Sequence, residues 1–138
     1  MLRALLCRFL ELTESAPYHA QVHSAKLSRE EQIVYELSRA YRKRNAVLTR
    51  SEVEKLTGYC SDHVERIVKR HTGMTLSEYG RLFLLQRAAR MLSDSDKSVG
   101  SICEELGYSN RTYFNRIFRE RYGLTPAEYR RRGAAASV

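Results

Sequence analysis

The stretch GYSNRTYFNRIFRERYGLTPAEY, Gly107–Tyr129, decides the fold because its pattern occurs twice in the 138-residue chain. The first copy is GYCSDHVERIVKRHTGMTLSEY, Gly58–Tyr79, and the second copy has one extra residue in its turn. Residues 66–79 align with 116–129 without a gap. The identical pairs are Arg66/Arg116, Ile67/Ile117, Gly73/Gly123, Thr75/Thr125, Glu78/Glu128 and Tyr79/Tyr129. We therefore expect one structural unit to be built twice.

Each copy predicts the same order of elements: a short helix, a glycine turn, a second helix, a closing glycine and a capped third helix. The apolar residues recur with the 3.6-residue period of a helix, and no run alternates long enough to indicate a strand. The S/T-x-x-E capping boxes that mark helix starts are Ser28…Glu31, Thr49…Glu52, Thr75…Glu78 and Thr125…Glu128. The predicted helices cover residues 29–44, 50–57, 61–72, 76–92, 99–106, 110–121 and 126–132. The fold class is all-α, with two helix-turn-helix subdomains joined by the long helix 76–92.

The residues before the repeat follow another pattern. An amphipathic helix is predicted near the N-terminus by the spacing of Leu2, Leu5, Leu6, Phe9 and Leu12. Residues 14–27, which include Pro17, have the composition of a linker. We divide the chain into residues 1–27, a helix and linker for dimerisation, interdomain contact or fold-back, and residues 28–138, the repeated domain. The sequence leaves open the oligomeric state and whether residues 1–27 belong to a longer, sensor-containing protein.

The composition favours a polyanionic partner. The chain has 24 Lys and Arg against 16 Asp and Glu, a net charge of +8, which suits nucleic acid or an anionic membrane surface. No segment approaches the roughly 20 apolar residues of a membrane span. The three cysteines, Cys7, Cys60 and Cys103, form no C-x-x-C pair, as is typical of a reducing cytosol. We expect a soluble cytoplasmic protein with no cofactor, no metal and no membrane contact.

In the second helix of each copy, the residues predicted to face inward are similar in the two copies, whereas those predicted to face outward differ. The inward positions Val64/Phe114, Ile67/Ile117 and Val68/Phe118 stay apolar in both copies. The outward positions differ, as expected if each copy meets different bases. They are Ser61, Asp62, Glu65, Arg66 and Lys69 in the first helix, and Arg111, Thr112, Asn115, Arg116 and Arg119 in the second. A solvated charged face is the alternative interpretation of such a set.

The outward residues are of types that can form hydrogen bonds with the edges of DNA bases. Arginine pairs with guanine O6 and N7, asparagine with adenine N6 and N7, and a carboxylate accepts from cytosine N4. For Glu65 two interpretations stay open: a contact to cytosine, or an ion pair with Lys69 four residues on. Residues 109–132 hold seven arginines and two glutamates, so we expect the second copy to dominate specificity.

The repeat resembles the DNA-binding domain of AraC/XylS-type bacterial transcription regulators over about residues 29–132. The most specific match is ICEELGYSNRTYFNRIFRERYGLTPAEYR, which contains the I-x-x-x-x-G-Y, Y-F-x-R-x-F and G-x-T-P-x-x-Y-R motifs of that family. The first copy departs from the family pattern at Glu54, Cys60 and Val68. These departures leave the fold intact and concern only the strength of the base contacts in the first unit.

The resemblance implies a sequence-specific regulator of double-stranded DNA that inserts helices 61–72 and 110–121 into successive major grooves, with RNA polymerase as a further partner. At 1.5 Å per residue the connecting helix would be about 25 Å long, a plausible spacer for grooves about 34 Å apart. The base readers that carry over from the family are Asp62, Glu65 and Arg66, then Thr112, Tyr113 and Arg116. Tyr113 is ambiguous because the helical period also lets it face the core. We expect Arg130 to contact phosphate.

Two other classes of function fit the sequence less well. An enzyme is disfavoured because the four histidines have neither a nucleophile nor a metal-ligand spacing beside them. Some DNA-alkylation repair proteins have such a domain with a reactive cysteine, but neither Cys60 nor Cys103 lies in a cysteine cluster, and we expect Cys103 in the core. The alternative function is a basic helical adaptor that binds an acidic protein. A steep salt dependence of DNA retention would separate it from a DNA-binding protein.

Overall fold

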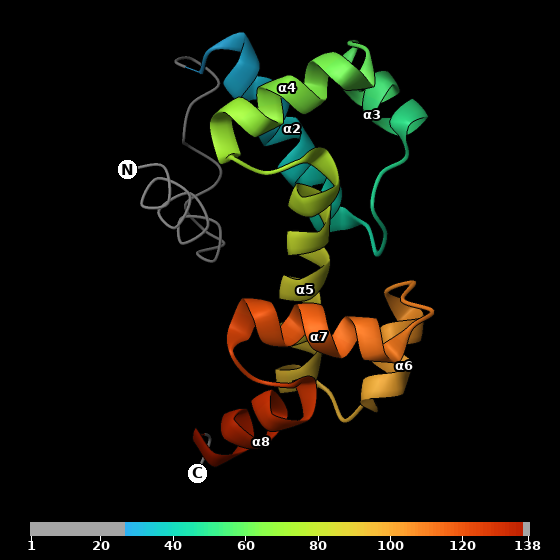
Figure 1. Cartoon of the computed structure of the whole chain (residues 1–138), viewed down its shortest axis with the longest axis vertical. Helices are drawn as coiled ribbons and strands as arrows, with labels where there is room; N and C mark the ends of the chain where they lie inside the picture. The colour runs from blue at the N-terminus through green and yellow to red at the C-terminus, as the bar shows by residue number, and fades with distance from the viewer. Residues whose placement is uncertain (1–26, 137–138) are drawn as a thin grey trace. The chain divides into compact units, whose positions relative to one another are not determined.

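The computed structural model describes residues 27–136, and all regular structure within that range is helical (Figure 1). The all-α fold class is thereby confirmed. The helices are α2 Arg29–Lys43, α3 Arg50–Thr57, α4 Ser61–Thr72, α5 Leu76–Asp94, α6 Val99–Glu105, α7 Arg111–Tyr122 and α8 Pro126–Ala136. The amphipathic helix and linker predicted within residues 1–27 lie outside the described residues, apart from Leu27, so the division of the chain at that point stays a prediction.

The helix bounds agree closely with the sequence prediction. The bounds of α3 and α4 are confirmed, α2 and α6 end one residue earlier than expected, and α5 and α8 continue further. Helix α7 begins at Arg111 because Asn110 is its N-cap, with an extended backbone and a side chain that accepts a hydrogen bond from the Tyr113 amide. All four predicted capping boxes form, with each glutamate accepting from the backbone N–H three residues earlier.

The chain forms two compact units, each containing one copy of the repeat. Unit 1 comprises residues up to Arg39 and Thr49–Tyr79, and unit 2 comprises Ala40–Leu48 and the residues from Gly80 onward. In unit 1 the core is formed by α2, α3, α4 and the first turn of α5. Its buried apolar residues are Ile33, Val34, Leu37, Val53, Val64, Ile67, Val68 and Tyr79.

Unit 2 has a larger core with more aromatic residues. One face of α5 packs with α6 and α7 in a cluster of Leu84, Leu85, Ala88, Ala89, Leu92, Ile102, Cys103, Leu106, Phe114, Ile117 and Phe118. The predicted core position of Cys103 is confirmed, since its side chain is 3% exposed. Burial raises the pKa of the Cys103 thiol, which keeps the sulfur in the poorly nucleophilic thiol form.

Residues 40–48 pack against α5 at a site that only glycine allows. The ring of Tyr41 stacks on Phe83 with centroids 5.6 Å apart. A Cβ atom at Gly80 would lie 2.8 Å from Cε1 of Tyr41, which is closer than two non-bonded carbon atoms approach each other. Gly80 therefore lets the α5 backbone approach this ring. Within the described range, no helix is long and apolar enough to cross a membrane.

Candidate nucleic-acid interface

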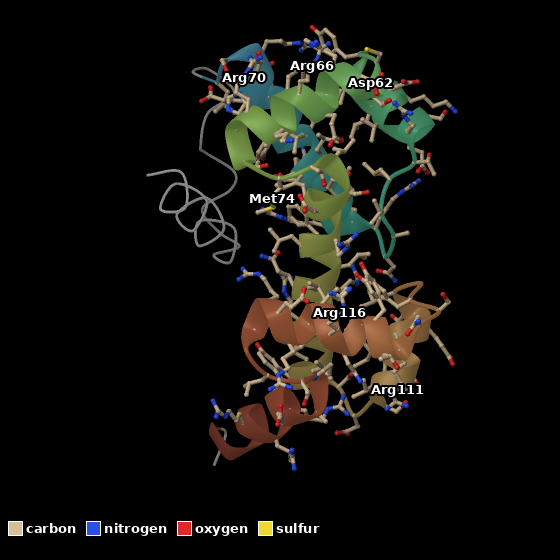
Figure 2. All side chains as sticks on the ribbon, viewed as in Figure 1. Asp62, Arg66, Arg70, Met74, Arg111 and Arg116 are labelled. Carbon is tan, nitrogen blue, oxygen red and sulfur yellow. The ribbon has the colours of Figure 1, made fainter. Side chains whose placement is uncertain are left out.

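In unit 1, α3 and α4 form a helix-turn-helix around Gly58. Its left-handed backbone, with φ of 75°, ends α3, and its N–H donates to the Glu54 carbonyl. A residue with a Cβ atom is strained in this conformation. Helix α4, the recognition helix of unit 1, begins shortly afterwards and turns its apolar residues inward. Asp62, Arg66 and Arg70 follow one another along its exposed side (Figure 2).

The first residues of α4 are held by α3. Ser61 was expected to point outward, and this expectation is wrong: the residue is 6% exposed. Its Oγ accepts a hydrogen bond from Arg50 Nε over 2.8 Å, and its backbone N–H donates to Glu54 Oε1 over 3.0 Å. Asp62 is exposed and forms an ion pair with Arg50. The acidic charge at the start of α4 is therefore partly neutralised before any nucleic acid approaches.

Two cations remain available on α4. Arg66 and Lys69 are exposed, and within residues 27–136 neither side chain forms a hydrogen bond or ion pair. Glu65 is half-buried, and its Oε2 accepts from the backbone N–H of Leu76 over 3.1 Å. The predicted ion pair with Lys69 is absent among the described side chains. The exposed chemistry of α4 is thus mainly cationic.

A three-residue cluster at the end of α4 was not foreseen from the sequence. Glu30 of α2 accepts from His71 Nε2 over 2.9 Å and from Arg70 over 2.7 Å. The hydrogen bond from His71, followed by that from Arg70, lowers the pKa of the Glu30 carboxyl. His71 is half-buried. These contacts fasten the recognition helix to α2.

Unit 2 repeats the motif with α6 and α7. Gly107 takes the left-handed conformation of Gly58, with φ of 77°, and α7 is the recognition helix of this unit. Phe114, Ile117 and Phe118 are buried on its inner side, as predicted. Arg111, Thr112, Arg116 and Arg119 are all exposed. The outer face of α7 therefore offers guanidinium groups and a hydroxyl.

Arg116 lies above an aromatic ring at the edge of the core. Its guanidinium is 5.2 Å from the ring centroid of Tyr113, and that of Arg81 is 5.8 Å from the same ring. Arg116 also forms an ion pair with Glu120 over 2.8 Å, with both side chains 61% exposed. An exposed pair of this kind contributes little to stability, so Arg116 can exchange its partner at small cost. The sequence left open whether Tyr113 faces outward or into the core. The residue is half-buried and packs against the core cluster, so it lies at the edge of the core.

Asn115 and Arg130 differ from their expected positions. Asn115 is half-buried, and its Oδ1 is buried without a hydrogen-bond partner. Arg130, expected at phosphate, directs its guanidinium to backbone carbonyls in the last turn of α5 and in the connection that follows it: Nε donates to Leu92 over 3.2 Å, and Nη2 donates to Lys97. Nη2 also lies 3.5 Å from the Ser95 carbonyl. The observed role of Arg130 is therefore to close the C-terminal end of α5.

Comparisons with known proteins agree with this geometry. A family of helix-turn-helix domains matches residues 55–132. The probable transcription factor PqrA of Proteus vulgaris is 36% identical over 90 residues, which cover 65% of this chain and 74% of PqrA. The transcriptional activator RhaR of Mannheimia succiniciproducens is 37% identical over 83 residues, 56% of this chain and 30% of RhaR. The chain thus matches less than a third of that longer relative.

The fold agrees equally well. A crystal structure of an AraC-type regulator from Chromobacterium violaceum superposes with a TM-score of 0.69 at 25% identity, covering 75% of this chain and 93% of that one. The matched family and relatives are regulators rather than enzymes, and they do not favour the interpretation as an adaptor for an acidic protein. The chain belongs to the AraC/XylS-type helix-turn-helix family of bacterial DNA-binding transcription regulators.

Proposed function

We propose that the protein recognises a specific double-stranded DNA site by placing α4 and α7 in the major groove. The observation that carries this proposal is the outer face of α7, where Arg111, Thr112, Arg116 and Arg119 are exposed above a rigid aromatic core. A helix fits the width of the major groove, and arginine is the commonest partner of guanine there. Because α7 is already ordered by packing on this core, DNA binding does not have to offset the entropy cost of ordering its backbone.

The roles of the cations differ with their surroundings. Arg66 and Arg116 occupy equivalent positions of the repeat and are both exposed, so we assign them bidentate contacts to guanine. Lys69 and Arg119 are also equivalent and lie one turn from the helix end, which suits contacts to phosphate. Phosphate contacts release bound counterions, so affinity should fall steeply with salt. The net charge of +8 supports this non-specific component.

The DNA site should be asymmetric. Each recognition helix has its own set of exposed residues, with Asp62 beside Arg66 in unit 1 and Thr112 beside Arg116 in unit 2. Two different helices that read successive major grooves require a site of about two helical turns, without the palindrome of a symmetric dimer. The ion pair with Arg50 uses only Oδ1 of Asp62, so the second carboxylate oxygen can accept from cytosine N4.

We also propose RNA polymerase as a second partner and the cytoplasm as the location. A transcription regulator acts on promoters, where polymerase is bound close by, and bacterial DNA lies in the cytoplasm. A regulatory outcome, activation or repression, depends on where the DNA site lies relative to the promoter. Purified polymerase and a promoter that contains the selected site would test the partner directly by a change in transcript yield.

The decisive experiment is selection of bound sequences from a random DNA pool, followed by footprinting on the selected site. We expect one asymmetric consensus and protection over about two helical turns. As the salt concentration rises, specific and random complexes should both weaken, with the specific complex remaining tighter. The proposal fails if no sequence is enriched above competitor DNA, and its two-helix form fails if protection is confined to one groove segment.

A further inference from the structure

Two positions of the repeat combine differently in the two units. Glu65 of α4 is equivalent to Asn115 of α7, and Leu76 at the start of α5 is equivalent to Pro126 at the start of α8. Both Leu76 and Pro126 are the first residue of the helix that follows the recognition helix. The pair Glu65 and Leu76 in unit 1 therefore corresponds to the pair Asn115 and Pro126 in unit 2. Leu76 has a backbone N–H at the start of its helix, whereas Pro126 has none.

In unit 1 the carboxylate of Glu65 is engaged with this helix start. Its Oε2 accepts from the Leu76 N–H over 3.1 Å, and the contact joins two residues that are 11 apart in the sequence. The first backbone N–H groups of a helix have no partner within the helix, and the local dipole favours a negative charge. Glu65 satisfies one of these groups. Turning it to a base would leave that half-buried amide without its acceptor.

In unit 2 the same contact cannot form. Proline has no N–H, and its fixed φ suits the first position of a helix, so Pro126 makes α8 independent of a side-chain acceptor. Asn115 has no equivalent donor, and its Oδ1 is buried without a partner. The residue as a whole is half-buried, and within residues 27–136 its side chain forms no hydrogen bond. Among the described residues, the Asn115 amide is therefore not tied to the helix that follows, unlike the Glu65 carboxylate.

We propose that the two equivalent positions have separated into different tasks: Glu65 is a positioning residue that fixes α4 to the start of α5, and Asn115 is a specificity-determining residue that donates to DNA. The inference rests on the proposed DNA-binding function and gives these two residues different roles in it. With its oxygen turned inward, Asn115 suits a base edge that only accepts, such as guanine O6 and N7 or thymine O4. It does not form the bidentate pair with adenine, which needs the oxygen as well.

Sequence selection on the full chain tests both assignments together. Wild type, Glu65→Gln and Asn115→Ala are each used to select from the same random DNA pool. Glu65→Gln should return the wild-type consensus, with somewhat tighter binding to every DNA because one negative charge is lost. Asn115→Ala should return a consensus in which preference at one guanine or thymine is lost. A base change with Glu65→Gln, or an unchanged consensus with Asn115→Ala, would overturn the inference. Absence of any consensus with wild type would instead overturn the proposed function.

A double-mutant cycle then separates positioning from a general structural effect. Glu65→Ala should lower the urea midpoint of unfolding, whereas Glu65→Gln, which keeps an acceptor oxygen, should retain most of it. In a Leu76→Pro background the donor is gone, so Glu65→Ala should cause no further loss. The pair Asn115→Ala and Pro126→Leu is the matched control, and Asn115→Ala should leave the midpoint unchanged or raise it. An undiminished effect of Glu65→Ala in the Leu76→Pro background would refute the positioning role.

Discussion

Arg130 Nε donates a hydrogen bond to the carbonyl oxygen of Leu92 over 3.2 Å, so a side chain of α8 closes the last turn of α5. The same guanidinium donates to the Lys97 carbonyl in the connection that leads to α6. The last carbonyls of a helix lack partners within it, and a cation at this end also suits the helix dipole. Arg130 is therefore part of the frame that supports the recognition helix of unit 2.

Replacing Arg130 by alanine should destabilise the fold before it affects DNA. Hydrogen bonds to a charged group contribute about 1.5–3 kcal/mol, and because the residue is half-exposed we expect a loss of about 1–2 kcal/mol in the free energy of unfolding. Urea unfolding of Arg130→Ala measures it, with Arg131→Ala, an exposed neighbour on α8, as the control. If the two variants are equally stable and only Arg130→Ala binds every DNA more weakly, Arg130 contacts phosphate and does not stabilise the fold.

Arg116→Ala should cost about 1–3 kcal/mol of binding free energy at the selected site and relax preference at one base pair. Arg116→Lys is the matched control, because it keeps the charge and loses the bidentate geometry. Binding to random DNA should weaken much less for the lysine variant than for the alanine variant. Equal losses on selected and random DNA would identify Arg116 as a phosphate contact. Titrations by fluorescence anisotropy at one fixed salt concentration provide the comparison.

Glu120→Gln should tighten DNA binding through the same arginine. Glu120 holds Arg116 in an exposed ion pair over 2.8 Å, so its carboxylate competes with DNA for the guanidinium and also repels phosphate. Because exposed pairs contribute about 0–1 kcal/mol, we expect a gain of that order in binding free energy and almost no change in stability. The same titrations measure it. Unchanged affinity would mean that Arg116 does not leave Glu120 on binding.

The helices could be predicted because their signals are local. Capping boxes, left-handed glycines and apolar spacing each depend on residues within one or two turns, and the bounds of α3 and α4 follow from them. The core position of Cys103 is equally a matter of helical period. What each helix touches depends on residues distant in sequence, and this limits prediction of the site.

Ser61, Glu65 and Arg130 illustrate that limit. The sequence predicts outward positions for Ser61 and Glu65 and a phosphate contact for Arg130, yet each side chain is engaged by another helix or by the chain that follows one. The partner of Arg130 lies 38 residues away in sequence, and no local pattern marks such a contact. One signal was available for Glu65: the repeat pairs Leu76 with Pro126, and the difference in backbone N–H indicates a contact made in one copy only.

The N-caps of the two recognition helices should respond in opposite directions. Asn110 accepts from the Tyr113 amide over 2.9 Å, so Asn110→Ala should lower the free energy of unfolding by about 0.5–2 kcal/mol. Cys60 occupies the same position before α4 with an extended backbone, yet its side chain makes no capping hydrogen bond. Cys60→Ser supplies an acceptor there and should raise stability by up to about 1 kcal/mol. Urea unfolding of both variants is the measurement, and a stabilising Asn110→Ala would contradict the argument.

The cluster of Glu30, His71 and Arg70 should make unit 1 sensitive to acid. The hydrogen bond from His71, followed by that from Arg70, holds the pKa of the Glu30 carboxyl below its usual value of 4.5. A carboxyl with a lowered pKa in the folded state stabilises the fold above the usual pKa, and this contribution is lost as the pH falls through the lower folded-state value. Glu30→Gln should therefore be less stable than wild type near neutral pH.

The same variant should approach wild type as the pH falls from 4.5 downward, because protonation removes the ionic contact from the wild-type protein as well. The measurement is the urea midpoint of both proteins from about pH 6 to about pH 3, since this range spans the titration of a carboxyl with a lowered pKa. Glu36→Gln, which removes a carboxylate from α2 outside the cluster, is the control and should keep a wild-type pH profile below 4.5 more closely than Glu30→Gln. A constant difference between Glu30→Gln and wild type across the whole range would mean that the ionised state of Glu30 does not stabilise the fold.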